Sequence, residues 1–259
     1  VMENLESVLI PAGKLWNTGH GVNMMREAVS MMGGYGITED CPGFLGTKWI
    51  DGQLEATYEG PEVVQRRQLS LTMTREVFLL QFRQWIAELG EVPVSRPDVG
   101  AAALASAMEL WLWSVEYLQE AKDSAGKGLY QNQRHGVTYP MADAFCWLAA
   151  SYFQIQDVLE LADKGPGNPA LAEGLEGLVN FNSDLCCIHC ARAAGETARI
   201  CAEIVFGYMD PARAQSELEA LHVLRRKVEE RLAGSKLAKE RAARSLAQVM
   251  IPEVLDYPA

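Results

Sequence analysis

Segments with helical spacing, separated by short turns rich in glycine and proline, run through almost the whole chain. Apolar residues recur with the period of an amphipathic helix, and we find no run with the alternation of a strand. The turn residues end these segments in the manner of helix caps and breakers. We expect helices over 11–32, 44–52, 61–89, 97–123, 139–162, 171–207, 211–233 and 235–250. The chain is therefore predicted to be all-α.

A proline-containing segment at 90–100 closes no helical period and is the predicted domain boundary. It divides the chain into residues 1–90 and a second helical bundle, residues 91–259. The expected apolar face of the helix over 61–89 consists of Val64, Leu71, Val77, Phe78, Phe82, Trp85 and Leu89. Aromatic residues expected to pack in the second bundle are Trp111, Trp113, Tyr117, Phe145, Trp147, Tyr152 and Phe153. In the first helix, Pro11 suits the first turn, and Gly19 and Gly21 suggest close approach of another backbone.

Composition describes an ordinary globular protein of 259 residues with 49 % hydrophobic and 22 % charged residues. A net charge of −11 argues against nucleic acid as a partner, because phosphates are neutralised by clustered Lys and Arg. A basic run at 225–244 is interpreted as a solvated helix face, with an acidic partner or an anionic surface as the alternative. Apolar runs fall short of the ~18 residues of a transmembrane segment, and the first residues lack signal-peptide features. We expect a cytoplasmic protein.

Four potential metal ligands lie together at Cys186, Cys187, His189 and Cys190. On a helix, positions 186, 189 and 190 would share one face. The segment lacks the paired C-x₂-C spacing of zinc sites, and cysteine is among the most readily buried residues. We therefore predict a buried apolar helix with reduced thiols and no metal.

Two short motifs point to a chemistry. A Gly-Gly-Tyr-Gly turn at 33–36 is followed by Tyr-Glu-Gly at 58–60 and by Gln65-Arg66. In order and spacing, these residues resemble the flavin- and substrate-facing end of an acyl-CoA dehydrogenase. The resemblance covers roughly residues 8–75. It implies an FAD-dependent enzyme that introduces an α,β double bond into an acyl-CoA thioester. By position and helix content, the later residues resemble the helical C-terminal extension of long family members.

The resemblance makes Glu59 the base that removes the α-proton, a task that suits a carboxylate in a site that excludes water. Its backbone amide would help to hold the thioester carbonyl as negative charge develops there. Gly60 would permit close approach of the substrate, and Tyr58 would pack beside it. The alternative for Glu59 is a structural role at a helix N-terminus, where the macrodipole favours an acid.

Flavin-contacting positions of the family fall on Ser30, Gly33, Gly34, Pro61 and Val63. Three of these depart from the family pattern: Ser30 and Val63 replace Gln, and Pro61 replaces Thr. Proline removes both a hydroxyl and an amide hydrogen at that position. Either FAD is held differently, mainly by the backbone of Gly33-Gly34, or this copy of the site is vestigial.

In the family, the Tyr-Glu-Gly tripeptide lies near the end of the enzyme, whereas here it begins at residue 58. We expect the chain to be the C-terminal portion of a larger dehydrogenase or one member of a multi-chain assembly, and to be inactive alone. The resemblance further implies an electron-transfer flavoprotein as electron acceptor and a homodimer. The alternatives are a non-catalytic subunit or interaction module, and a helical scaffold unrelated to flavin chemistry.

Overall fold

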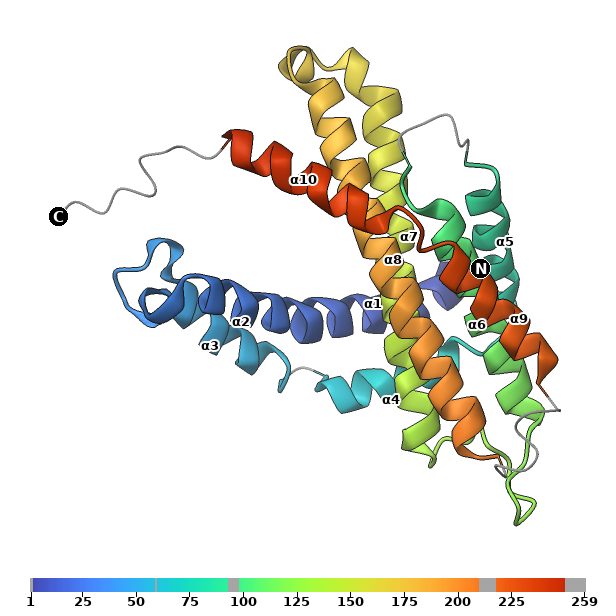
Figure 1. The fold of residues 1–259 in the computed structure, drawn as a ribbon. Coiled ribbons are helices and arrows are strands. Elements are labelled where there is room, and N and C mark those ends of the chain that lie inside the picture. Colours follow the sequence, from blue (N-terminus) through green and yellow to red (C-terminus); the bar gives the residue numbers. More distant parts are fainter. Residues whose placement is uncertain (1, 59, 93–97, 210–217, 250–259) are drawn as a thin grey trace.

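The computed structural model describes residues 2–58, 60–92, 98–209 and 218–249 (Figure 1). These residues form α-helices and short 3₁₀ or π turns, and their only β pairing is a single bridge between Lys122 and Gly128. The α-helices are α1 (Met2–Leu15), α2 (Gly21–Met31), α3 (Leu45–Glu55), α4 (Glu62–Thr72), α5 (Glu76–Gly90), α6 (Ala101–Glu120), α7 (His135–Lys164), α8 (Leu175–Gly207), α9 (Glu219–Glu230) and α10 (Ser235–Val249). The predicted all-α class is confirmed. None of the described helices is long and apolar enough to cross a membrane.

The two longest helices, α7 and α8, pack along each other and form the centre of a helical bundle (Figure 1). Helix α6 packs against both of them, α5 and α9 pack on α6, and α10 crosses α8. Helices α1 and α4 pack on each other and on α7, which attaches the N-terminal part of the chain to the bundle.

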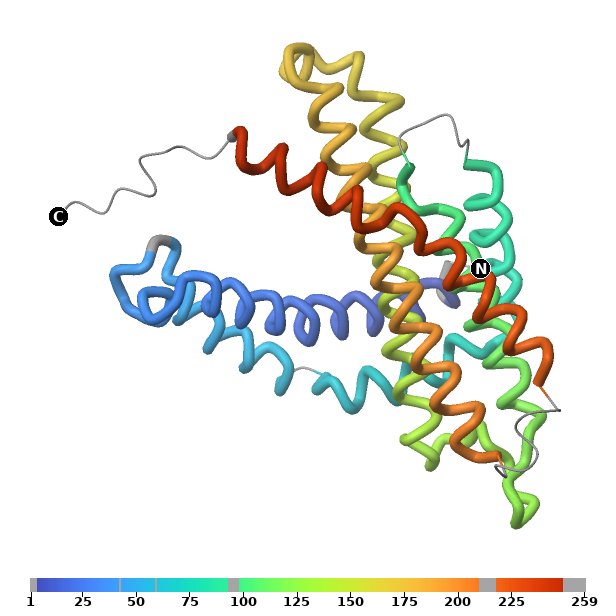
Figure 2. The backbone as a smooth tube through the Cα atoms, in the orientation of Figure 1, coloured from blue at the N-terminus to red at the C-terminus, as the bar shows by residue number. Residues whose placement is uncertain are grey.

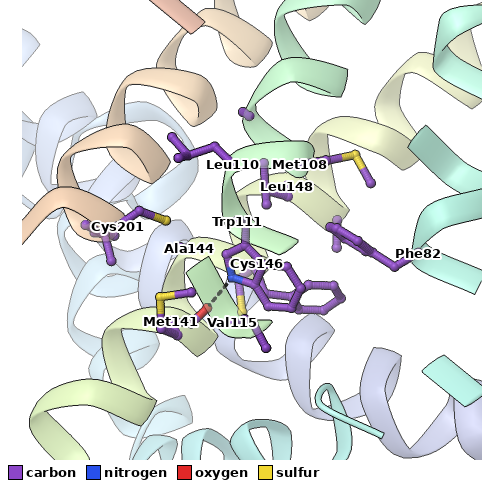
Figure 3. Packing of buried hydrophobic residues seen from close by; sticks show 14 of the residues in the cluster. Phe82, Met108, Leu110, Trp111, Val115, Met141, Ala144, Cys146, Leu148 and Cys201 are labelled. Atoms are coloured by element: carbon purple, nitrogen blue, oxygen red, sulfur yellow. Dashed lines mark hydrogen bonds between the residues drawn. The ribbon is translucent and has the colours of Figure 1, made fainter. Parts of the chain in front are cut away.

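The hydrophobic core is centred on Trp111, whose side chain is completely buried (Figure 3). Its indole Nε1–H donates to the carbonyl of Met141 over 2.9 Å, and its ring lies 4.8 Å from Phe82 and 5.6 Å from Phe145. The same cluster of buried residues extends to Val8 in α1. The core is thus continuous across residue 90, and the division into 1–90 and 91–259 stays a prediction.

A helical hairpin projects away from the bundle (Figures 1 and 2). We call residues 21–55 the arm: it comprises α2, two 3₁₀ turns (Gly33–Ile37 and Pro42–Phe44) and α3. Helix α2 buries no residue, and α3 buries only Gly46. The large apolar side chains that the arm exposes are Met24, Met31, Met32, Ile37, Phe44, Ile50 and Leu54.

The first helix begins at Met2, nine residues before the predicted start, and Pro11 lies inside it. A proline in a helix interior leaves the carbonyl four residues earlier without its usual donor. Here that carbonyl belongs to Ser7, and it accepts a hydrogen bond of 3.0 Å from the hydroxyl of Thr72 in α4. The tertiary contact therefore compensates for the missing amide, and the helix continues.

The predicted helix over 61–89 is two helices, α4 and α5, because the chain turns at Met73 and is extended at Arg75. The break allows α4 to pack on α1 and α5 to pack on α6. It also divides the predicted apolar face. Its buried members are Phe78, Phe82, Trp85 and Leu89, whereas Val64, Leu71 and Val77 are exposed.

The remaining helices lie close to their predicted ranges, and residues 97, 211–217 and 250 of those ranges lie outside the described residues. Of the aromatic residues expected to pack, Trp111, Phe145 and Tyr152 are buried, and Phe153 is 41 % exposed. The basic run is only partly a solvated face. Lys227 pairs with Glu109 at 2.5 Å, and Arg241 pairs with Asp184 at 2.5 Å, so both cations tie their helices to the bundle.

Candidate functional site

The loop that carries the Tyr-Glu-Gly tripeptide connects α3 to α4. Glu59 itself lies outside the described residues. The hydroxyl of Tyr58 donates to Glu55 Oε1 over 2.8 Å, and Lys14 Nζ lies 5.2 Å from the centre of the Tyr58 ring. Lys14 also donates to the backbone carbonyl of Glu55 over 2.8 Å. These contacts tie the N-terminal side of the loop to the end of α1.

Gly60 follows with a φ of +87°, a conformation that glycine adopts far more readily than other residues. A Cβ at this position would lie 2.0 Å from Nε2 of Gln65, so the Gln65 side chain occupies the space above the glycine. The glycine is therefore explained within this chain by the turn and by Gln65.

Pro61 precedes the first turn of α4, and its carbonyl accepts from the amides of Val64 and Gln65 at 2.8 and 3.1 Å. Val63 is 58 % exposed. Neither side chain can donate a hydrogen bond to a flavin, so the only donor that these two positions offer is the backbone amide of Val63.

The Gly-Gly-Tyr-Gly turn lies at the tip of the arm, and its glycines differ in their surroundings. Gly33 ends α2 with a φ of +62°, as a C-terminal helix cap requires. Gly36 is buried, and a Cβ there would lie 2.6 Å from the carbonyl oxygen of Val29. Gly34 has neither a positive φ nor any neighbour within 4 Å of a Cβ. Gly34 therefore has no structural requirement for glycine among the described residues. Ser30, one turn earlier, is exposed.

The arm separates the two motifs. Gly33 and Gly34 precede α3 at the tip, whereas Gly60 follows α3 at the base of the arm. The 11 residues of α3 correspond to roughly 16 Å of helix at 1.5 Å per residue. One copy of the chain thus presents the two predicted contact regions at opposite ends of the same hairpin.

A cavity of about 400 Å³ lies at the base of the arm, beside the Tyr-Glu-Gly loop. Ala56 and Glu62, which flank that loop, both line it. The remaining lining residues are Leu15, Trp16, Thr18, Gly19, His20, Val22, Asn23, Gln53, Arg66, Asp143, Cys146 and Trp147. The wall is mixed, with three charged side chains and three aromatic rings.

The charged part of this wall is organised by Arg66. Its Nε donates to Asp143 Oδ1 over 2.8 Å, and its Nη1 donates to Glu62 Oε2 over 2.9 Å. Partial burial raises the pKa of Asp143 above its ordinary value, although the Arg66 guanidinium opposes this effect. Glu62 also rests against Gly19, where a Cβ would lie 2.9 Å from Oε1. The prediction that another backbone approaches Gly19 is wrong, because the Glu62 carboxylate occupies that space.

The aromatic part of the wall gathers around a π turn, Trp16–His20, that joins α1 to α2. The ring of His20 stacks on Trp16 at 4.1 Å, and Trp147 of α7 packs edge-on to both at 4.9 and 4.7 Å. His189 of α8 lies behind them, 5.3 Å from Trp16, and its Nδ1 is 3.2 Å from the hydroxyl of Ser151. Such π turns within helices occur frequently at functional sites.

Both histidines of this cluster favour the neutral form. Burial lowers the pKa of His20, and the positive charge of Arg192 lowers it further. For His189, burial together with the charges of His20 and Arg192 lowers the pKa to about 4. The imidazole rings are consequently uncharged at neutral pH.

The Cys186–Cys190 segment lies inside α8, as expected for a buried helix. Cys186, Cys187 and Cys190 are buried free thiols, and burial raises the pKa of Cys186 to about 12 and that of Cys187 to about 11. His189 contacts the hydroxyl of Ser151 and the ring of Trp147. Within the described part of the chain, no group of three His, Cys, Asp or Glu residues has the geometry to hold a metal ion.

Most of the cavity could not be found by sequence reasoning. The sequence predicts Gln65 and Arg66 only as part of a motif, and Trp147 only as a packing residue. Asp143 carries no local signal, since its role depends on a partner 77 residues away. The spacing of Trp16 and His20, four residues apart, is the one signal that could have placed two rings on one helix face.

Comparison with known families supports the motif assignment. Residues 2–73 match the family model of the acyl-CoA dehydrogenase C-terminal domain. The match covers 72 of the 259 residues, and this part of the chain is similar to the acyl-CoA dehydrogenases. The match ends at the turn between α4 and α5 and includes the arm, the π turn and the Tyr-Glu-Gly loop. Comparison with curated proteins and with solved structures finds no match to either.

Proposed function

We propose that the chain contributes the catalytic carboxylate of an FAD-dependent acyl-CoA dehydrogenase, with Glu59 as the base. The observation that carries this proposal is the family match over 2–73, which includes the Tyr-Glu-Gly loop. Tyr58 is bonded to Glu55, and Ala56 and Glu62 on the two sides of the tripeptide line a cavity, which supports this role. Glu59 would take the α-proton of the thioester, and its amide would hold the carbonyl as enolate character develops.

The tip of the arm fits a flavin better than the base of the arm does. Gly34 is open and has no structural need for glycine, so its backbone can be approached closely by a ligand from outside the chain. Gly33, Gly34 and the hydroxyl of Ser30 are the groups that would hold FAD there. Pro61 and Val63 would contribute only packing. When bound, FAD supplies the acceptor for the hydride that leaves the β-carbon. Electrons would then pass to an electron-transfer flavoprotein.

Substitution of the base tests the proposal directly. In the enzyme that contains this chain, Glu59→Gln should lower kcat by roughly 10²–10⁴-fold, because this is the usual contribution of a general base. The flavin absorbance spectrum of the purified variant should be unchanged. Glu55→Gln and Glu62→Gln are matched controls on either side of the loop and should keep most of the rate. Undiminished turnover by Glu59→Gln would show that Glu59 is not the base.

A non-catalytic subunit is the second candidate. Pro61 and Val63 favour it, because neither side chain offers the hydrogen bonds found at these positions in the family. In this case, Glu59→Gln would leave the turnover of the assembly unchanged, and a carboxylate of the partner would be essential instead.

A further inference from the structure

The cavity at the base of the arm is lined by two carboxylates and one guanidinium. Arg66 uses Nε for Asp143 Oδ1 and Nη1 for Glu62 Oε2. Among the described residues, Glu62 Oε1 and Asp143 Oδ2 receive no hydrogen bond. Two carboxylates and one guanidinium leave the cavity with a formal excess of one negative charge.

The aromatic wall adds a second attraction for positive charge. The negative faces of tryptophan rings attract cations. The ring of Trp147 already attracts one cation, because the guanidinium of Arg192 in α8 lies 5.1 Å from the centre of that ring. Arg192 does not line the cavity, so the cavity itself is not filled by this cation.

Other positive groups near the site are engaged elsewhere or uncharged. Lys14 donates to Glu55 and lies over Tyr58, outside the cavity lining. His20 and His189 have lowered pKa values and are neutral at pH 7. The charged groups that face the cavity are therefore Glu62, Arg66 and Asp143 alone.

We propose that this cavity binds a small organic cation, with an alkylammonium group placed between the carboxylates of Glu62 and Asp143 and the rings of Trp16 and Trp147. The volume of about 400 Å³ falls within the range of small-molecule sites. Ammonium N–H groups would donate to the two free carboxylate oxygens, and the alkyl part would pack on the indole rings. The site is inferred from the cavity alone and does not depend on dehydrogenase activity.

Butylammonium and 1-butanol form a matched pair of probes, since they share shape and differ in charge. Isothermal titration calorimetry of the chain with butylammonium chloride, at constant ionic strength, should give a saturable isotherm. 1-Butanol should give no saturable heat over the same concentrations. Equal responses to the two probes, or no response to butylammonium, would overturn the proposal.

Isosteric amides locate the bound cation. Glu62→Gln and Asp143→Asn each keep an acceptor for Arg66 but remove a negative charge, and each should weaken butylammonium binding roughly tenfold, as expected for a hydrogen bond to a charged group. Asp163→Asn makes the same charge change on an exposed part of α7 and should leave the affinity unchanged. Circular dichroism verifies that each variant is folded. Equal weakening by Asp163→Asn, or wild-type affinity in both cavity variants, would contradict the site.

Discussion

Arg66 and Asp143 lie 77 residues apart in the sequence and form an ion pair of 2.8 Å that joins α4 to α7. Glu62, one turn earlier on α4, pairs with the same guanidinium at 2.9 Å. The three side chains connect the family-matched part of the chain to the helices that follow it. They also form one wall of the cavity beside the Tyr-Glu-Gly loop.

Removing the shared cation should destabilise the fold. Arg66→Met leaves two carboxylates facing each other, but the side chains of Arg66 and Asp143 are 24 % and 41 % exposed, so solvent screens much of the effect. We expect a loss of about 1–2 kcal/mol in the free energy of unfolding, measured by urea denaturation. Arg26→Met is the control, because Arg26 and its partner Glu27 are both 63 % exposed. It should change stability by less than about 0.5 kcal/mol. Equal losses in the two variants would contradict a special role for Arg66.

Acid should destabilise the ring cluster through His189. Its folded-state pKa of about 4 lies below the ordinary value of 6.5. Above pH 6.5 both states are neutral and no penalty arises. Between pH 6.5 and 4 the unfolded state binds a proton that the folded state does not, so stability falls with falling pH. We expect His189 to account for a loss of about 2 kcal/mol between pH 7 and 4.5, after allowance for its partial exposure.

The contribution of His189 is isolated by comparing variants across this pH range. His189→Gln should flatten the dependence of unfolding free energy on pH relative to the wild type. His135→Gln, which alters an exposed histidine at the start of α7, should keep the wild-type slope. A parallel pair of curves for wild type and His189→Gln would refute the assignment.

Alanine should destabilise the protein at one glycine of the motifs and not at the other. Gly60→Ala forces a Cβ into a left-handed conformation against Gln65, and should lower thermal stability by about 1 kcal/mol. Gly34→Ala adds a methyl group in open space without strain, and should leave the melting temperature unchanged. If Gly34 serves the cofactor, the same variant should purify with less FAD, measured from the flavin absorbance of the purified protein without added FAD. Destabilisation by Gly34→Ala would instead indicate a structural role.

The exposed side chains of the arm should mediate self-association. Ile50 is 63 % exposed on α3, and the arm displays six further large apolar side chains. We expect the wild-type chain to sediment as a dimer at micromolar concentration and Ile50→Glu to sediment as a folded monomer. Leu237→Glu places the same charge on a 59 % exposed position of α10 and should remain dimeric. A monomeric wild type would count against the dimer.

Local signals were sufficient for most of the helices but not for the junctions between them. The buried face of Phe78, Phe82, Trp85 and Leu89 follows from helical periodicity alone. The turn at Met73 contains neither glycine nor proline, so the helical periodicity of the sequence continues across it. The prediction of burial is therefore wrong for Val64, Leu71 and Val77. Pro11 predicts a helix start, because the donor that compensates for its missing amide, Thr72, is far away in the sequence.

In the candidate site, too, the features set by local conformation are predictable from the sequence, and those set by tertiary contacts are not. Gly33 at a helix end and Gly60 in a tight turn are positions where a local conformation demands glycine, and both adopt a positive φ. The cavity depends on tertiary contacts, because it combines the base of the arm with α4 and α7. Sequence patterns within a helix carry no information about which distant helix will meet it.

The sparse burial of the arm has a consequence for how the molecule opens. Among the described residues of the arm, only Gly36, Cys41 and Gly46 are buried, so the arm gains little from global folding. Helices α6, α7 and α8, by contrast, contain most of the fully buried side chains. The backbone amides of the arm should therefore exchange hydrogen through local fraying, and those of the bundle through cooperative unfolding. A ligand or partner that covers the arm should therefore slow amide hydrogen exchange in α2 and α3, even where binding leaves the melting temperature of the whole chain unchanged.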